Sequence, residues 1–144
     1  MAEELCFHFD VDGDNFTSAG AASVEVKRKL RQLGLDANTI RRVSIAMYEG
    51  EINMVVHARG GCADVCVDKD SVTIILSDSG PGIPDISLAM QEGYSTAPDN
   101  IRALGFGAGM GLPNMKRYTD EMNIETVLGE GTTVTMKVYF VAGK

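Results

Sequence analysis

Apolar and polar residues alternate from Leu5 to Val11, and this period of two predicts a half-buried strand. Two later parts of the chain contain a pair of strand-like segments on either side of a turn, so each part predicts a hairpin. The expected hairpins are 63–68 with 72–77, around Lys69-Asp70, and 124–127 with 132–140, around 129–131. The chain is therefore expected to build a β-sheet from several short strands.

Helical segments bounded by capping and stop residues are expected between these strands. In chain order they are a helix to Leu33 with Thr17 or Ser18 as N-cap and Gly34 as stop, a helix to about Ala58 with Asp36 or Asn38 as N-cap and Gly60-Gly61 as stop, and a helix from Leu112 to Tyr118. Residues 80–111 are rich in Gly, Pro and Ser, with a short helical piece near Leu88. The order β-α-α-β-β-loop-α-β-β predicts a two-layer α+β sandwich, in a single domain over residues 1–144.

Length, composition and charge limit the function classes. The 144 residues suit one domain with one core, and 44% hydrophobic residues are ordinary for a globular protein. The net charge of −7 argues against a nucleic-acid partner, and the densest basic run, residues 27–31, is interpreted as a solvated helix face. No apolar run has membrane-spanning length and the N-terminus does not resemble a signal peptide, so we expect a cytoplasmic protein with no membrane partner.

The cysteines predict little chemistry. Cys6, Cys62 and Cys66 are odd in number and fit no zinc-site spacing. Because His8 and His57 are the only histidines, we do not expect a Cys/His metal site. Reduced, partly buried thiols are the expected state in the cytosol.

The second expected helix carries a carboxylate and an amide one turn apart, Glu49 and Asn53. A spacing of four places both on one side of the helix, where Glu49 can accept a proton and the amide oxygen of Asn53 can ligate Mg²⁺. Few protein ligands are needed if phosphate oxygens and waters complete the Mg²⁺ shell. The alternative is an ordinary polar helix face, of which Glu51 would be as good a member as Glu49.

An acidic residue follows the apolar run that predicts the third strand. Asp78 precedes a turn with glycines at Gly80 and Gly82, which let a ligand approach the backbone closely. A carboxylate at a strand end can accept a hydrogen bond from the amino group of adenine. The alternative is a plain turn with Asp at its first position.

A triple-glycine segment, with Gly107, Gly109 and Gly111, leads into the helix expected from Leu112. Backbone N–H groups at such a helix start can hold phosphates. The segment is neither a Walker A loop nor a Rossmann fingerprint, because no Lys-Ser/Thr follows it and no strand directly precedes it. We predict that residues 91–110 form a lid over a nucleotide, and the alternative is a loop without a ligand.

Together the three motifs resemble the N, G1 and G2 boxes of the Bergerat-fold (GHKL) ATPase superfamily, which includes gyrase, a heat-shock chaperone, histidine kinases and mismatch-repair proteins. The matching residues are Glu49 and Asn53, then Asp78, Gly80, Gly82 and Ile83, then Gly107, Gly109, Met110, Gly111 and Leu112. Thr132 matches a threonine that such proteins place near the adenine. The resemblance spans about residues 5 to 140. It implies a mixed sheet with helices on one face, and binding of ATP or ADP with Mg²⁺.

The size of the chain narrows this resemblance. There is no room for a dimerisation helix pair with a phosphoacceptor histidine, or for a transducer domain. The chain looks most like the stand-alone anti-sigma serine/threonine kinases of bacterial partner-switching systems. In these kinases the residue matching Glu49 is the catalytic base and the residue matching Asn53 ligates Mg²⁺. Their substrate is typically a serine or threonine of a small STAS-type antagonist protein.

One departure bears on the partner. Kinases that hold sigma factors often carry an arginine just before the glycines, whereas this chain has Phe106-Gly107. The glycine loop is more similar to that of switch kinases, which act on scaffold STAS proteins and then on a phosphatase. The alternative function is a nucleotide-gated module that binds a sigma factor or a protein phosphatase without significant kinase activity. The resemblance is compatible with a homodimer as well as with a monomer.

Overall fold

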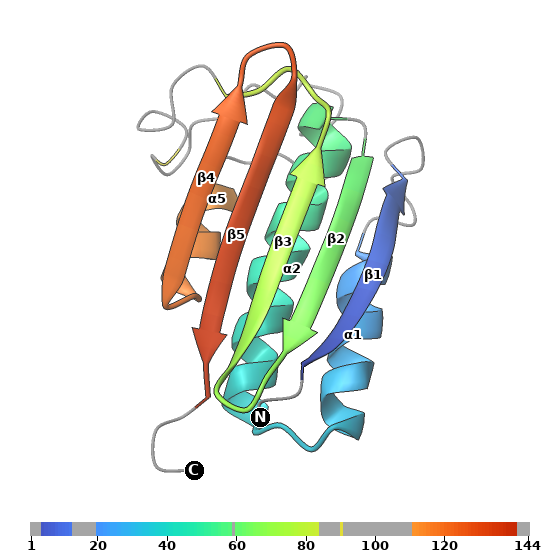
Figure 1. Cartoon of the computed structure of the whole chain (residues 1–144), viewed down its shortest axis with the longest axis vertical. Helices are drawn as coiled ribbons and strands as arrows, with labels where there is room; N and C mark the ends of the chain where they lie inside the picture. Colours follow the sequence, from blue (N-terminus) through green and yellow to red (C-terminus); the bar gives the residue numbers. More distant parts are fainter. Residues whose placement is uncertain (1–3, 13–19, 59, 84–89, 91–110, 141–144) are drawn as a thin grey trace.

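The computed structural model describes residues 4–12, 20–58, 60–83, 90 and 111–140 (Figure 1). In chain order the described elements are β1 (Leu5–Asp12), α1 (Ala21–Gln32), α2 (Ala37–Ala58), β2 (Gly60–Val67), β3 (Ser71–Asp78), α5 (Gly111–Arg117), β4 (Glu121–Val127) and β5 (Gly131–Tyr139). The predicted piece near Leu88 and the predicted lid over 91–110 lie outside the described residues. Among the described helices, none is both long enough and apolar enough to cross a membrane.

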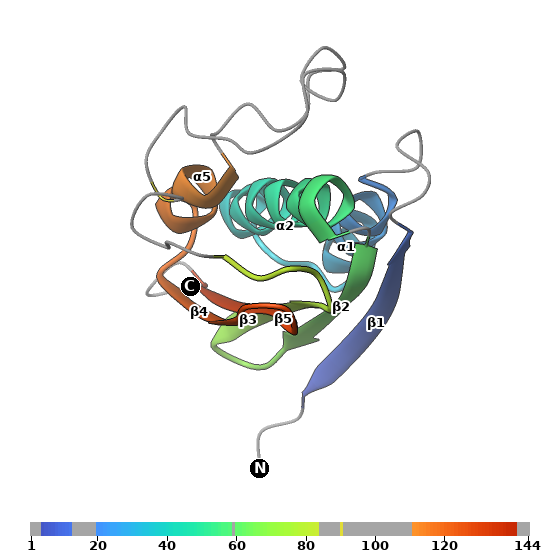
Figure 2. The ribbon, with the colours of Figure 1, turned by 90° about the horizontal axis from the view of Figure 1, so that it is seen from above.

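The described elements form two layers. The strands make one five-stranded sheet in the order β1-β2-β3-β5-β4, and the three helices cover one of its faces (Figure 2). This confirms the predicted α+β sandwich with helices on one face. The predicted mixed sheet is wrong, because all four neighbouring strand pairs are antiparallel. β3 and β4 do run parallel, but β5 lies between them and pairs with both.

The core lies between the two layers. Every second residue of the inner strands points toward the helices, as the period of two requires, and α1 and α2 turn one apolar side toward the sheet. Representative fully buried side chains are Val26 and Leu30 of α1, Val43 and Met47 of α2, Val65 of β2, Ile74 of β3 and Met136 of β5. Burial on this scale stabilises the fold by roughly 1.5–3 kcal/mol for each large side chain. The opposite face of the sheet remains open in the described structure.

The starts of the two long helices have different origins. α2 begins as predicted after Asp36, whose carboxylate accepts the backbone N–H of Thr39 at 2.9 Å and its hydroxyl at 2.6 Å. α1 begins at Ala21 with Gly20 as N-cap, so the predicted caps Thr17 and Ser18, which lie outside the described residues, are wrong. The acceptor at this start is supplied from α2 rather than by a local side chain, as described below.

Strand register overturns one prediction and adds to another, since α2 does end at Ala58, before Gly60-Gly61, as predicted. Cys6 and Cys66 are paired directly across β1 and β2 and form a disulfide, so the expectation of three reduced thiols is wrong and Cys62 is the free cysteine. Gly60 and Gly61 follow the end of α2 but belong to β2, where they pair with the end of β1. Pairing between distant strands decides both points, and the spacing of residues along the chain does not reveal it.

Candidate functional site

The C-terminal half of α2 presents Glu49 and Asn53 to α5. Asn114 donates a hydrogen bond from Nδ2 to Oε2 of Glu49 at 3.3 Å, and Nδ2 of Asn53 approaches Sδ of Met115 at 3.8 Å. Glu49 and Asn53 are both half-buried, which leaves part of each side chain open to a ligand. Two polar residues one turn apart thus lie at the same junction, as their spacing predicts.

Glu51 points to a different neighbour. Its carboxylate is 2% exposed and accepts backbone N–H groups of Gly20 at 2.9 Å, Ala22 at 3.2 Å and Ser23 at 3.0 Å. The hydroxyl of Ser23 donates a further hydrogen bond at 2.7 Å. The three backbone bonds satisfy N–H groups at the start of α1 that have no acceptor within the helix itself. Glu51 is therefore a structural residue, and Glu49 is the glutamate that faces the junction of α2 with α5.

Asp78 ends β3 and fixes the chain on both sides of it. Its Oδ1 accepts the backbone N–H of Gly80 at 2.9 Å and that of Thr132, the paired residue of β5, at 3.2 Å. Within the described residues both hydrogen bonds end on Oδ1, so Oδ2 is available to a ligand. The plain-turn alternative accounts for the bond to Gly80, but not for the bond across the sheet to Thr132.

Two glycines hold the segment after Asp78 close to its neighbours. A Cβ at Gly80 would lie 2.6 Å from Cβ of Ala58, the last residue of α2. Gly82 has a φ of 84°, and a Cβ there would lie 2.9 Å from the backbone oxygen of Val127. The space and backbone conformation at Gly82 both exclude an ordinary side chain. These contacts place the segment between the end of α2 and the turn that joins β4 to β5.

A chain of threonine hydroxyls completes the attachment. Oγ1 of Thr126 accepts the backbone N–H of Ile83 at 2.8 Å and lies 2.9 Å from Oγ1 of Thr132. Pro81 also accepts the backbone N–H of Gly129 at 2.9 Å. Thr132, 8% exposed, therefore connects to both Asp78 and Ile83, which the sequence could only suggest through family resemblance.

The third motif is described only at its end. Gly111 is the first residue of α5, and Leu112 is 9% exposed against the core. Gly107, Gly109 and Met110 lie outside the described residues. Asn114 and Thr126 are the polar residues of the site that sequence reasoning missed. Asn114 lies one turn beyond Gly111, a spacing that was available as a signal, whereas the role of Thr126 depends on cross-strand pairing.

The structure thus arranges the described motif residues around the C-terminal half of α2. Glu49 and Asn53 face α5, and Gly80 touches the end of the same helix. The family model of the histidine kinase-like ATPase domain matches residues 15–138, which is most of the chain. The chain belongs to this family.

The proteins to which this chain is similar include a serine/threonine kinase and anti-sigma factors. The serine/threonine-protein kinase RsbT of Bacillus subtilis is 35% identical over 108 residues, which are 72% of this chain and 75% of that protein. The anti-sigma F factor of Clostridium novyi is 33% identical over 123 residues, covering 81% of this chain and 82% of its own. The predicted superfamily and its anti-sigma kinase branch are therefore confirmed.

Solved structures support the fold of the ATPase domain. The crystal structure of the RsbU and RsbW domains of Rv1364c from Mycobacterium tuberculosis has a TM-score of 0.65 and 17% identity. The match covers 94% of this chain and 32% of that longer chain. The mycobacterial sensor histidine kinase MprB has a TM-score of 0.54 and 16% identity, with 94% and 98% covered. At these identities the likeness concerns the fold alone.

Proposed function

We propose that the chain is an ATP-dependent serine/threonine kinase of a bacterial partner-switching system, whose substrate is a hydroxyl of a STAS-type protein. Membership of the kinase-like ATPase family supports nucleotide use, and the similar kinase and anti-sigma factors support a protein partner. The single observation that carries the proposal is the placement of Glu49. Glu49 faces the junction of α2 with α5, beside Asn53, whereas the carboxylate of Glu51 is buried and hydrogen-bonded to the start of α1.

The free oxygen atoms of Glu49 and Asn53 suit a nucleotide bound with Mg²⁺. Within the described residues the one hydrogen bond of Glu49 ends on Oε2, which leaves Oε1 for a substrate proton. The amide nitrogen of Asn53 is turned to Met115, which leaves its oxygen, a hard neutral atom suited to Mg²⁺. Bound ATP with Mg²⁺ would supply the phosphoryl group and offset its charge.

The residues at the end of β3 are assigned to the base. Oδ2 of Asp78 accepts a hydrogen bond from the adenine amino group, while Gly80, Gly82 and Ile83 let the backbone lie close to the base. Thr132 holds Asp78 in place through its backbone N–H and contributes its hydroxyl to the same end of the site.

The phosphates are assigned to the third motif: Gly107, Gly109, Met110, Gly111 and Leu112. Glu49 takes the proton of the attacking hydroxyl as the new bond forms, and positioned bases of this kind contribute about 10²–10⁴-fold in rate. The substrate hydroxyl would therefore approach α2 from the side of α5.

A binding module is the second candidate. There, nucleotide occupancy alone would control a complex with a sigma factor or a protein phosphatase. Two of the similar proteins described as anti-sigma F factors keep this candidate open. Such a module has no use for a general base, so the accessible carboxylate of Glu49 favours the kinase.

Transfer of label from ATP to a co-purified STAS-domain protein tests the proposal. The parent chain is expected to label the partner on serine or threonine. Glu49→Gln is expected to keep ATP–Mg²⁺ affinity while slowing transfer by about 10²-fold or more. If Glu49→Gln transfers at the parent rate, the assignment of the base is wrong. If no partner is labelled but ATP still controls the complex, the chain is a binding module.

A further inference from the structure

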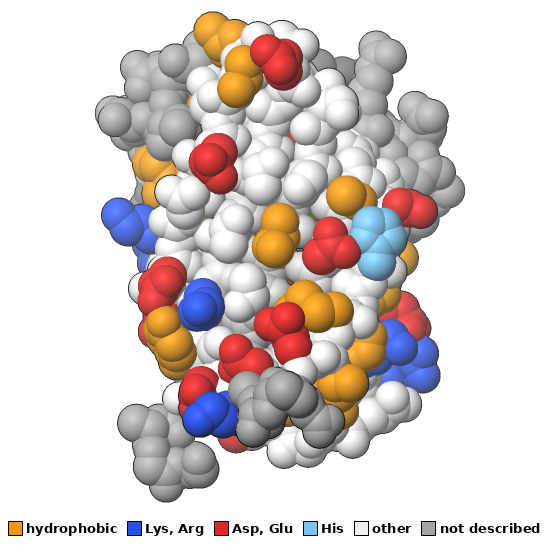
Figure 3. Space-filling model, in the orientation of Figure 1, with side chains coloured by type: hydrophobic (Ala, Val, Ile, Leu, Met, Phe, Trp, Pro, Cys, Tyr) orange, Lys and Arg blue, Asp and Glu red, His pale blue; other side chains and the backbone are white. Residues whose placement is uncertain are grey.

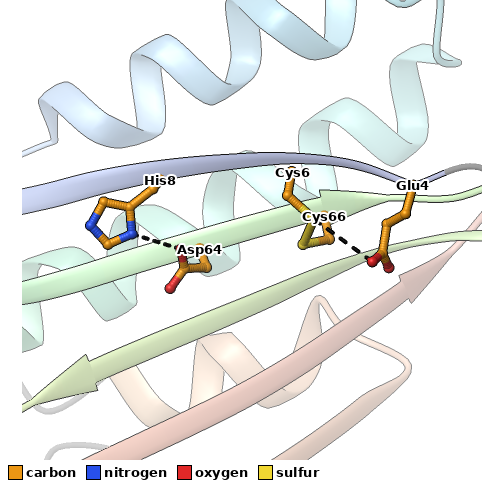
Figure 4. Close-up of a disulfide and its surroundings, with 5 residues drawn as sticks. All are labelled: Glu4, Cys6, His8, Asp64 and Cys66. Atoms are coloured by element: carbon orange, nitrogen blue, oxygen red, sulfur yellow. Dashed lines mark hydrogen bonds and ion pairs between the residues drawn. A yellow bond between two sulfur atoms is a disulfide. The ribbon is translucent and has the colours of Figure 1, made fainter.

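Side chains of the kinds that bind metals lie together on the open face of β1 and β2, on the side of the sheet opposite α2. Three alternate cross-strand pairs lie there: Cys6 with Cys66, His8 with Asp64, and Asp10 with Cys62. Alternate residues of a strand point to the same face, so all six side chains lie on the side of the sheet that the described helices leave uncovered. Figure 4 shows His8 turned toward Asp64, one pair along from the disulfide.

His8 lies at the centre of this group. Its Nδ1 is 2.7 Å from Oδ1 of Asp64, and its Nε2 is 3.2 Å from Oδ1 of Asp10. One ligand atom each from His8, Cys62 and Asp64 lies within 4.8 Å of the other two. The side chains of His8 and Asp64 are 56% and 41% exposed, and the histidine with neighbouring acids is visible on the open face in Figure 3. An ion can therefore reach the group from solvent.

The local charge favours a cation. Each ring nitrogen of His8 lies within hydrogen-bond distance of a carboxylate oxygen, Nδ1 of Asp64 and Nε2 of Asp10. Two carboxylates thus concentrate negative potential on a ring nitrogen and a thiol. A bound dication would offset this potential and allow Cys62 to bind as the thiolate.

We propose that His8, Cys62 and Asp64 form a binding site for a divalent cation of the zinc class. Nitrogen, sulfur and carboxylate oxygen are the ligands of Zn²⁺, at about 2.0–2.3 Å, and three protein ligands leave one position for water. A tetrahedral ion at these distances needs its nitrogen and oxygen ligands about 3.3 Å apart, so His8 and Asp64 have to separate by about half an ångström. Asp10 at Nε2 holds the ring, as carboxylates commonly do behind metal-bound histidines.

The disulfide makes the sulfur ligand unique. With Cys6 and Cys66 joined, Cys62 is the free thiol of the chain. The group bridges β1, an edge strand, to β2, so the ion would clamp that edge. Magnesium and calcium are poor candidates because they prefer oxygen ligands throughout. The site lies on the sheet face opposite α2, so its presence does not depend on nucleotide binding.

Cobalt titration of the full chain without nucleotide tests the site. Co²⁺ is expected to give a thiolate-to-cobalt absorption band at one equivalent, which Zn²⁺ removes by competition. Cys62→Ser should abolish the band, and His8→Gln and Asp64→Asn should each weaken binding at least about tenfold. Circular dichroism confirms that each variant is folded. A parent chain without a thiolate band, or Cys62→Ser with unchanged Zn²⁺ affinity, would overturn the proposal.

Matched variants separate this site from its neighbours. The double variant Cys6→Ser, Cys66→Ser removes the disulfide and is expected to keep the band, because Cys62 remains. His57→Gln, at the other histidine, and Glu125→Gln, on an exposed position of β4, should bind Zn²⁺ like the parent. If the double variant loses the band while Cys62→Ser keeps it, the disulfide is open in solution and the ion is bound by Cys6, Cys66 and Glu4 instead, and the proposed site is wrong.

Discussion

The hydroxyl of Ser23 donates a 2.7 Å hydrogen bond to the buried carboxylate of Glu51 and so attaches the start of α1 to the middle of α2. The same carboxylate accepts three backbone N–H groups, from Gly20, Ala22 and Ser23. Glu49 lies two residues earlier on α2, points to a different side of the helix, and contacts Asn114 of α5 instead. Two glutamates separated by one residue therefore have different tasks, one in stability and one in the proposed chemistry.

Glu51→Ala is expected to destabilise the protein by about 2–4 kcal/mol, because it removes an N-terminal acceptor and leaves buried donors without a partner. Glu49→Ala is the matched control on the same helix and should change the free energy of unfolding by less than about 1 kcal/mol. Urea unfolding followed by circular dichroism measures both. Equal losses for the two variants would contradict the division of roles.

Asp78→Asn should weaken ATP binding without unfolding the protein. The Oδ1 of asparagine can still accept the N–H groups of Gly80 and Thr132, so the turn and the strand end are kept. The new amide would present donors to the amino group of adenine, and a lost bond to a charged acceptor costs about 1.5–3 kcal/mol, or about 10–150-fold in affinity. Calorimetry with ATP–Mg²⁺ and GTP–Mg²⁺ measures this. A parent chain with no preference for ATP would show that Asp78 does not read the base.

Gly82→Ala is expected to be more harmful than Gly129→Ala, although both glycines have a left-handed φ, 84° and 79°. A Cβ at Gly129 meets no atom within 4 Å, so that change should cost only the backbone strain of about 1–2 kcal/mol. At Gly82 the Cβ would lie 2.9 Å from the backbone oxygen of Val127, which adds about 1–3 kcal/mol. Thermal unfolding of both variants gives the difference, and similar losses would show that the segment is not tightly held.

The sequence predicted the elements of the fold well where the determinants are local. Alternation predicted β1, and Asp36 predicted the start of α2, because a capping side chain and the N–H group it accepts are three residues apart. The predicted start of α1 was wrong because the carboxylate that accepts its first N–H groups belongs to Glu51, 31 residues away from Gly20. The sheet order was beyond reach for the same reason, since the insertion of β5 between β3 and β4 depends on long-range pairing.

Spacing along the chain predicted parts of the site that belong to one element. Glu49 and Asn53 are such a pair, but periodicity alone could not decide between Glu49 and Glu51, since the packing of α1 and α5 against α2 settles which glutamate is buried. The proposed metal site of His8, Cys62 and Asp64 was not predicted, because known zinc-site patterns rest on the spacing of ligands within one segment of the chain. Here register brings His8 beside Asp64, 56 residues later in the chain.

Asn53→Ala should remove the contribution of Mg²⁺ to ATP affinity. Its side chain is half-buried and its amide nitrogen faces Met115, so the fold should tolerate the change. Without the amide oxygen we expect the gain in ATP affinity on adding Mg²⁺ to fall at least about tenfold. Affinity for adenosine, which lacks phosphates, should be unchanged because Asp78 still holds the base.

Asn123→Ala is the control for this prediction, since Asn123 is exposed on β4, away from α2. Calorimetry with ATP, with and without Mg²⁺, distinguishes the variants. If Asn53→Ala keeps the full Mg²⁺ dependence of the parent while Asn123→Ala behaves identically, the metal is held elsewhere. A parallel loss of adenosine affinity in Asn53→Ala would instead indicate that the variant disturbs the whole site, and the assignment of Asn53 as a metal ligand would fail.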